Sequence, residues 1–148
     1  MEQETIRERA QESYGAYFGQ DSDYLNLIAE LEHSDDSDIS VSRQDQIRIE
    51  LGESLLSVDH LTHGVYADGD TWQVLLTTGG PAARVVITTD ADGDPFQAVF
   101  EFQDWFELWT AAPEQDRDLL IKWAVSVAYY YCEYCELDAH NTAARHTV

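Results

Sequence analysis

Acidic side chains are the most abundant groups in this sequence that could do chemistry. The 148 residues include 29 Asp and Glu but only 8 Lys and Arg, which gives a formal net charge of −21 at pH 7. Four acidic clusters are candidate partner-binding residues: Asp35, Asp36 and Asp38; Asp68 and Asp70; Asp90, Asp92 and Asp94; and Glu101, Asp104 and Glu107. Any one cluster is typical of a solvated surface. Together they could imitate duplex DNA, which carries about one negative charge per 1.7 Å of axis.

The third cluster also resembles the beginning of a calcium loop, in which acids alternate with other residues. Here Gly93 separates the last two acids, and no predicted helix precedes the segment. The twelfth position counted from Asp90 is Glu101, which falls in a predicted strand. Calcium loops of this type lie between two helices. The sequence therefore favours a β-turn here over a metal site.

Two cysteines and two histidines near the C-terminus have the residue types of zinc ligands. Cys132, Cys135, His140 and His146 form the pattern C-x₂-C-x₄-H-x₅-H. The cysteines also continue the apolar pattern of a predicted helix, in which they would pack as small hydrophobic residues. The sequence leaves both alternatives open, and we assign no metal and no cofactor. Two neighbouring cysteines provide no disulfide scaffold, which fits an intracellular protein.

No pattern typical of an enzyme occurs in the chain. The sequence lacks Gly-x-Ser-x-Gly, His-Glu-x-x-His and a glycine-rich phosphate loop followed by Lys. Pairs of carboxylates are so frequent here that their spacing does not indicate general acid–base catalysis. We therefore expect a protein that is not an enzyme.

The segment Trp105-Phe106-Glu107-Leu108-Trp109 is unusually aromatic. One interpretation is that Trp105 and Trp109 fill the junction between a sheet and the last helix. The other is a contact patch for a partner, because Trp is enriched among the residues that dominate protein interfaces.

Helices are predicted for residues 1–33, which precede the sheet. Ile6, Ala10 and Tyr14 recur at helical spacing in the first helix. Asp21-Ser22-Asp23 can cap a second, shorter helix. The acidic connection that follows marks the change from helices to sheet.

An antiparallel meander of four or five strands is predicted for residues 39–110. Ile47, Ile49 and Leu51 alternate with polar residues, which is typical of a half-buried strand. Asp68-Gly69 and Gly79-Gly80 separate β-rich runs and indicate hairpins. In the last strand four apolar residues are expected to share one face: Phe96, Ala98, Phe100 and Phe102.

A long helix over residues 113–137 is expected to pack on the sheet. Pro113 suits the first turn of a helix, and the acids that follow it suit the positive end of the helix dipole. Residues 138–148 are expected to form a loose tail. The whole chain, residues 1–148, is predicted to be a single α+β domain.

The residues Gly79-Gly80-Pro81-Ala82-Ala83-Arg84, followed by Gln103-Asp104-Trp105, resemble a pattern in small acidic proteins of phages, plasmids and other mobile elements. Tyr129-Tyr130-Tyr131 would match the aromatic closing helix of that group. The resemblance covers about residues 70–131. After Trp105 the chain keeps only the final Trp of the group's usual Gly-Thr-Pro-Trp. The resemblance implies a mobile-element origin and similarity to anti-restriction and anti-CRISPR inhibitors, some of which mimic DNA.

The sequence thus predicts a non-enzymatic inhibitor that binds a cationic nucleic-acid-binding host protein through an acidic, DNA-mimicking surface. Direct binding of nucleic acid is not expected, because such binding needs a basic patch. A membrane span is not expected either, since the longest near-apolar run, 123–131, is too short. The charged N-terminus does not resemble a signal peptide, so we expect a location in the host cytoplasm.

Two alternatives stay open, and the sequence does not indicate the oligomeric state. One Lys against seven Arg, with abundant Asp, is also the composition of a domain adapted to high salt. In that case the charge would concern solubility rather than a binding site. The second alternative is an acidic immunity-type module whose basic partner does not bind nucleic acid.

Overall fold

The computed structural model describes residues 3–32, 41–62, 70–78, 81–90, 92, 94–105 and 107–127. In chain order the elements are α1 (Gln3–Phe18), α2 (Asp23–Glu32), α3 (Val41–Glu53), β1 (Ser57–Thr62), β2 (Thr71–Thr77), β3 (Ala82–Thr89), β4 (Pro95–Gln103), β5 (Thr110–Ala111) and the helical residues 117–127. The predicted α+β class with an antiparallel sheet is confirmed.

The sheet is a meander with the strand order β1-β2-β3-β4-β5. Each strand is antiparallel to its neighbour, and Val74, Val85 and Phe100 lie opposite one another across β2, β3 and β4. Alternate residues along these strands are buried, so one face of the sheet is apolar. The half-buried residues of the opposite face include Gln73, Arg84 and Glu101.

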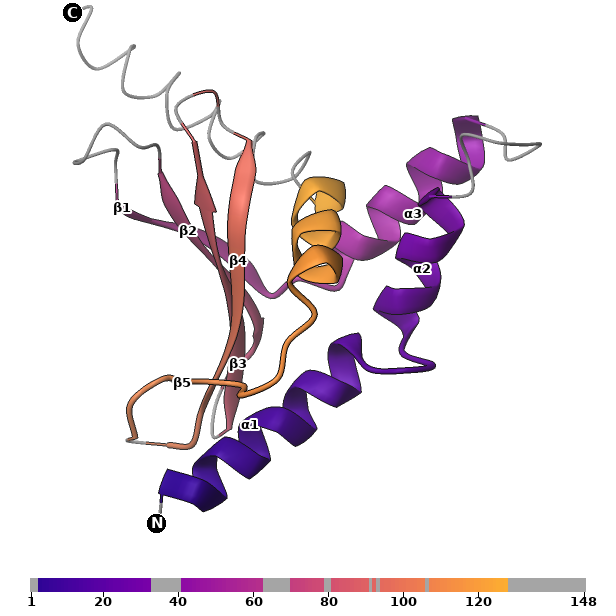
Figure 1. Cartoon of the computed structure of the whole chain (residues 1–148). Coiled ribbons are helices and arrows are strands. Elements are labelled where there is room, and N and C mark those ends of the chain that lie inside the picture. The colour runs from indigo at the N-terminus through magenta and orange to yellow at the C-terminus, as the bar shows by residue number, and fades with distance from the viewer. Residues whose placement is uncertain are drawn as a thin grey trace, which may run out of the picture.

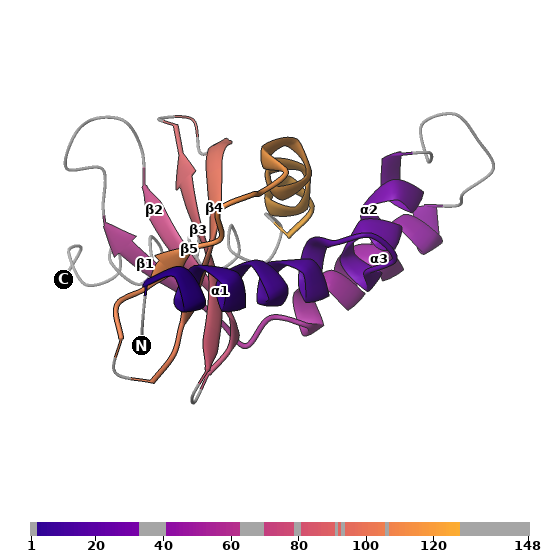
Figure 2. The same cartoon turned by 60° about the horizontal axis from the view of Figure 1, so that its bottom comes forward.

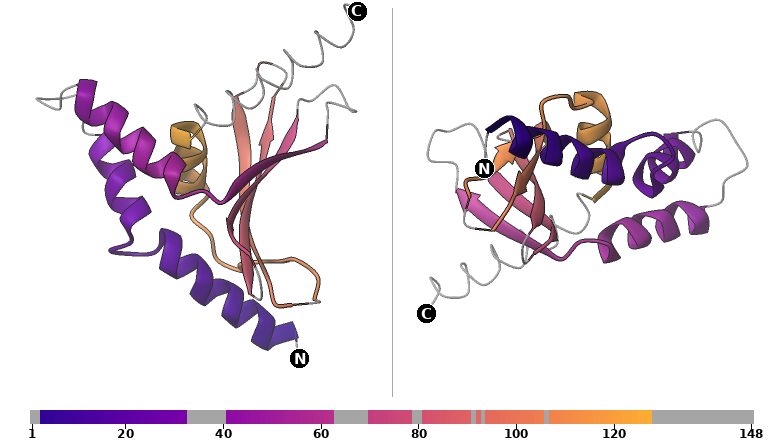
Figure 3. Two further views of the ribbon diagram at one scale, coloured as in Figure 1. Left: turned by 180° about the vertical axis from the view of Figure 1, so that it is seen from behind. Right: turned by 90° about the horizontal axis from the view of Figure 1, so that it is seen from below.

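Helix α1 and the helical residues 117–127 lie on the apolar face of the sheet (Figures 1 and 2). Helix α1 contacts β4 and β5. The helical residues 117–127, orange in the figures, lie between the sheet and the pair formed by α2 and α3. Figure 3 shows this pair extending beyond the sheet. The helical hairpin formed by α2 and α3 thus lies beside the sheet rather than across its face.

Aromatic rings connect α1 to the helical residues 117–127 and to the sheet. The Trp123 ring packs edge-on against Phe18 with centroids 5.3 Å apart, and Tyr14 packs edge-on against Phe100 at 5.6 Å. Trp123 and Phe100 are fully buried. Such edge-to-face pairs each contribute about 0.5–1.5 kcal/mol beyond the burial of their area. This aromatic core fixes α1 and the segment 117–127 against the middle of the sheet.

The prediction that the sheet begins near residue 39 is wrong, because residues 41–53 form the helix α3. Ile47 and Leu51 are fully buried, whereas Ile49 is 46% exposed. Ile47 and Leu51 are four residues apart and therefore share one face of a helix. The same segment also alternates apolar and polar residues, as a strand would. Its Arg, Gln and Glu residues are good helix formers, so the helix prevails. The helical N-terminal part therefore extends past residue 33, and the first strand is β1.

The last helix begins later than residue 113. Asp116 caps it, since the Leu119 N–H donates to Asp116 Oδ1 at 3.1 Å. The Gln115 side chain lies against β4 instead, where its Oε1 accepts from the Phe100 N–H and its Nε2 donates to the Phe100 carbonyl. The single Gln115 amide thus forms hydrogen bonds with both the N–H and the carbonyl of Phe100. The predicted continuation of the helix to 137 and the loose tail lie outside the described residues.

The strands predicted around Trp72, Arg84 and Phe100 are confirmed as β2, β3 and β4. Ala98, Phe100 and Phe102 of the expected apolar face of β4 are buried, whereas Phe96 is 43% exposed. The hairpin residues Asp68-Gly69 and Gly79-Gly80 lie outside the described residues. Among the residues that are described, no helix has the length and apolarity needed to cross a bilayer.

Candidate functional site

Asp90, Asp92 and Asp94 lie at the turn between β3 and β4. Asp90 Oδ1 accepts hydrogen bonds from the Asp92 N–H at 2.9 Å and the Asp94 N–H at 3.0 Å, and the Asp90 N–H donates to the Asp94 carbonyl. An Asp side chain commonly holds a turn in this way. Asp90 is therefore part of the turn itself, while Asp92 and Asp94 are exposed.

Asp70 lies at the same end of the sheet. Its N–H donates to Thr89 Oγ1, and the Thr89 N–H donates to its carbonyl at 2.8 Å. Its Oδ1 lies 3.4 Å from Nε2 of His60, whose ring stacks on Trp72 with centroids 4.0 Å apart. The structure thus brings Asp70 and the β3–β4 turn together. Sequence reasoning missed the stack, because it depends on the register of β1 against β2.

Asp104, at the opposite end of β4, is a buried member of an ion pair. Its Oδ2 lies 2.5 Å from Nη1 of Arg9 in α1, and its side chain is only 12% exposed. The Arg9 guanidinium also lies over the Phe102 ring, 5.3 Å from its centroid. This candidate partner-binding residue therefore joins the first helix to the sheet.

Glu101 belongs to a second network, centred on Arg84, on the polar face of the sheet. Arg84 donates to Glu101 Oε1 from Nε at 2.8 Å and from Nη2 at 2.7 Å, and from Nη1 to Gln73 Oε1 at 2.6 Å. The Arg84 guanidinium stacks over the Trp109 ring at 4.1 Å. The three side chains come from adjacent strands, which explains why the register of the sheet assembles them.

The loop between β4 and β5 presents two apolar side chains to solvent. Trp105 is 64% exposed and Leu108 is 86% exposed. Trp105 adopts a φ of 49°, which is uncommon for an aromatic residue. Trp109 packs on Arg84 rather than on the last helix, so the interpretation that both tryptophans fill that junction is wrong. Glu107 is exposed, and its N–H and carbonyl bond to Asp104 and Gln103.

Most of the Lys and Arg side chains among the described residues lie close to a carboxylate of the same chain. Five of them lie within ion-pair distance of a carboxylate: Arg9, Arg43, Arg48, Arg84 and Lys122. Each such pair neutralises one acid that could otherwise face a partner. The acids at the β3–β4 turn have no Lys or Arg at ion-pair distance among the described residues. The negative potential is therefore concentrated where the acids lack such a cation.

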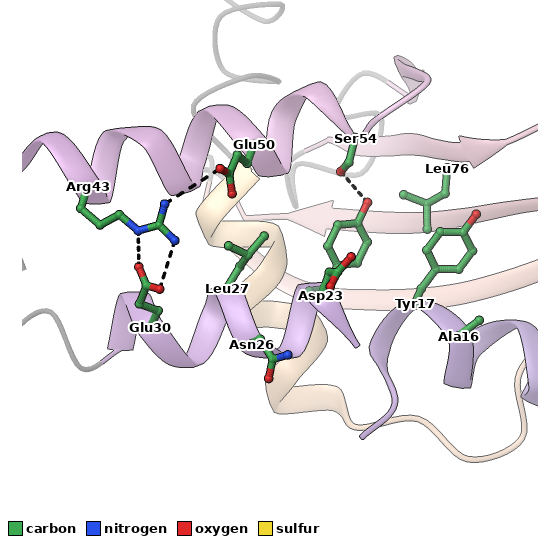
Figure 4. Close-up of a pocket in the computed structure, with 11 residues that line it drawn as sticks. Ala16, Tyr17, Asp23, Asn26, Leu27, Glu30, Arg43, Glu50, Ser54 and Leu76 are labelled. Atoms are coloured by element: carbon green, nitrogen blue, oxygen red, sulfur yellow. Dashed lines mark hydrogen bonds and ion pairs between the residues drawn. The ribbon is translucent and has the colours of Figure 1, made fainter. Parts of the chain in front are cut away.

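An open pocket of about 730 Å³ lies among α1, α2, α3 and β2 (Figure 4). Arg43, Glu30 and Glu50 lie at one end of it, and Tyr17 and Leu76 lie at the other. Arg43 donates to both oxygens of Glu30, from Nε at 2.5 Å and from Nη2 at 3.1 Å, and its Nη1 is 3.9 Å from Glu50. These contacts hold α2 and α3 together.

Two tyrosines form the aromatic part of this pocket. The rings of Tyr17 and Tyr24 stack with centroids 6.1 Å apart, and the Tyr24 hydroxyl lies 2.6 Å from Ser54 Oγ. Burial raises the pKa of both phenols above the usual value of 10, so both are neutral at pH 7. The hydrogen bond from Arg43 lowers the pKa of Glu30, which keeps that carboxylate ionised.

Several predicted residues cannot be placed. Asp35, Asp36, Asp38 and Asp68 lie outside the described residues, as do the four candidate zinc ligands near the C-terminus. Within the part of the chain that is described, no group of three or more His, Cys, Asp or Glu side chains is arranged to hold a metal ion. At Asp90–Asp94 the structure shows the turn that the sequence favoured.

Comparisons of the chain with protein-family models, with curated proteins and with solved structures found no match. A function for this chain must therefore be inferred from its sequence, its fold and the side chains described above.

Proposed function

We propose that this protein is a non-enzymatic inhibitor that binds a cationic nucleic-acid-binding protein through its acidic surface. The resemblance to mobile-element proteins suggests a host defence protein as the target, either a CRISPR effector or a restriction system. The partner would be displaced from DNA or RNA, because the carboxylates compete for the same cationic groove.

The unequal use of charge is the observation that supports this proposal. Four arginines and the single lysine lie within ion-pair distance of a carboxylate of the same chain, whereas Asp92 and Asp94 are exposed at the end of the sheet beside Asp70. Self-repulsion of the remaining acids costs stability, and a cationic partner would relieve it. Trp105 and Leu108, exposed at the opposite end of β4, offer a separate apolar contact of the kind that dominates binding energy at interfaces.

A competition assay tests the proposal. A panel of restriction endonucleases and CRISPR effectors is bound to a fluorescent duplex, and the protein is titrated in while anisotropy is recorded. We expect the protein to displace the duplex from at least one member of the panel. The concentration needed should be at least about tenfold lower than that of a polyglutamate competitor with the same total charge. The logarithm of the binding constant should fall linearly with the logarithm of the salt concentration. Displacement no better than polyglutamate for every member would overturn the proposal.

A matched pair of variants separates local from global charge. Asp90→Asn combined with Asp92→Asn and Asp94→Asn removes three charges and keeps the Asp90 oxygen that accepts from the turn. Glu8→Gln, Glu12→Gln and Glu114→Gln remove three charges elsewhere on the exposed surface. We expect the first triple variant to compete more weakly than the second. Equal loss in both would mean that only net charge matters, which contradicts an arranged surface.

Melting curves test the alternative of adaptation to high salt. An inhibitor that acts in ordinary cytoplasm should be folded in dilute buffer. A domain that needs molar salt to fold would show that the charge serves solubility, and the proposal would fail.

A further inference from the structure

We infer that the pocket among α1, α2, α3 and β2 binds a small aliphatic cation, with a guanidinium or ammonium group at one end of a short hydrocarbon stem. This inference is independent of the acidic surface of the sheet, because none of the pocket residues belongs to the clusters at the sheet ends. Charge, hydrogen-bonding capacity and shape lead to the same class of ligand.

The charge of the pocket is negative. Asp23, Glu30 and Glu50 line it, and Arg43 is its single cationic lining residue. Arg43 already shows how this site holds a guanidinium, since it lies between Glu30 and Glu50 (Figure 4). Three carboxylates against one guanidinium leave the lining with a formal charge of −2. Asp23 is also close to Leu27 along the wall of the pocket, at the start of α2.

Hydrogen-bond acceptors outnumber donors in the pocket. Ser54 Oγ donates to the Leu51 carbonyl at 2.6 Å, so it accepts the hydroxyl proton of Tyr24. Both hydroxyl protons are therefore committed within the protein, and the oxygens keep lone pairs. The carboxylates accept only, although Asn26 and Tyr17 can also donate. A ligand that carries several N–H donors and a positive charge fits this arrangement.

The rest of the lining suits a hydrocarbon stem. Leu27, Leu76 and Ala16 provide apolar surface, and Tyr17 presents its ring at the end of the pocket opposite Arg43. A cation held near a tyrosine face gains from the negative charge of the π system. The stem would lie between Leu27 and Leu76, with its charged group shared between Asp23 and the Tyr17 ring.

Calorimetry with two ligands of matched shape tests the inference. n-Butylguanidinium and n-butylurea differ by one charge and by the replacement of an N–H donor group with a carbonyl oxygen. We expect the cation to bind the full-length protein at least about tenfold more tightly than the urea, and less tightly as salt is added. Equal affinities, or no binding of the cation at millimolar concentration, would overturn the inference.

Two neighbouring aspartates provide the matched variants. Asp23→Asn removes the pocket carboxylate that is placed beside the ligand's charged group, whereas Asp21→Asn removes an acid that does not line the pocket. Asn tolerates the φ of 65° at position 21. We expect a loss of affinity of about fivefold or more only for Asp23→Asn, with unchanged melting of both variants. Equal losses would show that general charge, not the pocket, attracts the cation.

One further ligand identifies the source of the cation. N-acetyl-arginine amide carries the same single charge on a side chain with its backbone groups, whereas n-butylguanidinium carries it on a free stem. Comparable binding of both indicates a site for an arginine side chain of a protein. Binding of n-butylguanidinium alone indicates a free small cation. Tyr17→Leu should weaken both ligands, because the aromatic face is lost while apolar contact is kept.

Discussion

The two ends of strand β4 use the same kind of side chain in opposite ways. Where β4 leads to β5, Asp104 is buried against Arg9, and Glu101 is bonded to Arg84. Where β4 begins, Asp92 and Asp94 are exposed beside the turn that Asp90 holds. We call these the paired end and the exposed end of the sheet.

The net charge of −21 therefore includes acids of two kinds. Acids at the paired end contribute to folding, because each satisfies a guanidinium that is itself partly buried. Removing one partner would leave the other desolvated and uncompensated. Acids at the exposed end cost little to remove, since exposed charges interact weakly through water. Only acids of the second kind are available to a partner.

The largest effect is expected for Arg9→Ala at the paired end. The variant leaves Asp104 buried without its cation and removes the guanidinium that lies over the Phe102 ring, so the free energy of unfolding should fall by about 2–3 kcal/mol. Urea denaturation measures this free energy. Arg7→Ala is the control: Arg7 is exposed on the same helix, and its loss should change stability by less than about 0.5 kcal/mol. Similar values for both variants would remove the distinction between the two ends.

Glu101→Gln should have the next largest effect. The amide oxygen can still accept hydrogen bonds from Arg84, but the negative charge that neutralises the Arg84 guanidinium is lost. We expect a loss of about 1–2 kcal/mol in the free energy of unfolding. Glu107→Gln, at an exposed position six residues later, should be nearly neutral. A Glu101 variant as stable as the Glu107 variant would mean that the Arg84 network contributes no stability.

At the exposed end, Asp90 differs from its neighbours. Asp90→Ala removes the oxygen that accepts two backbone N–H groups, and we expect a loss of about 1 kcal/mol. Asp90→Asn keeps that oxygen and should be milder, and Asp92→Ala should be nearly neutral. Thermal and urea unfolding of the three variants test this order. If Asp90→Asn were as damaging as Asp90→Ala, charge rather than the turn geometry would be the role of Asp90.

Sequence patterns predicted the sheet well, because its signals are local. Alternating apolar residues and glycine-containing turns located β2, β3 and β4. The same alternation was misleading at Ile47, Ile49 and Leu51, where three residues are too few to separate a strand from a helix. Packing of Ile47 and Leu51 into the core decides the outcome, and packing is a property of the whole fold.

The candidate sites could be predicted less well. Sequence clusters identified the turn acids, but Arg9 and Asp104 are 95 residues apart in the chain, and no local pattern connects them. The pocket draws its lining from positions between Ala16 and Leu76 on four different elements. Its tyrosines have the spacing of ordinary core residues, so only the tertiary structure shows that they face a cavity.

The smallest effect on stability, and the most informative one, is expected for the double variant Asp92→Asn and Asp94→Asn. Relief of repulsion at the exposed end should leave the free energy of unfolding unchanged or raise it by a few tenths of a kcal/mol, roughly, in dilute buffer. In 1 M NaCl the Debye length is about 3 Å, so that gain should vanish. The loss in Arg9→Ala should persist there, because buried pairs are screened much less. Urea denaturation at both salt concentrations gives the four values. A loss above about 1 kcal/mol in the double variant would make these acids structural, and they would no longer be candidates for binding a partner.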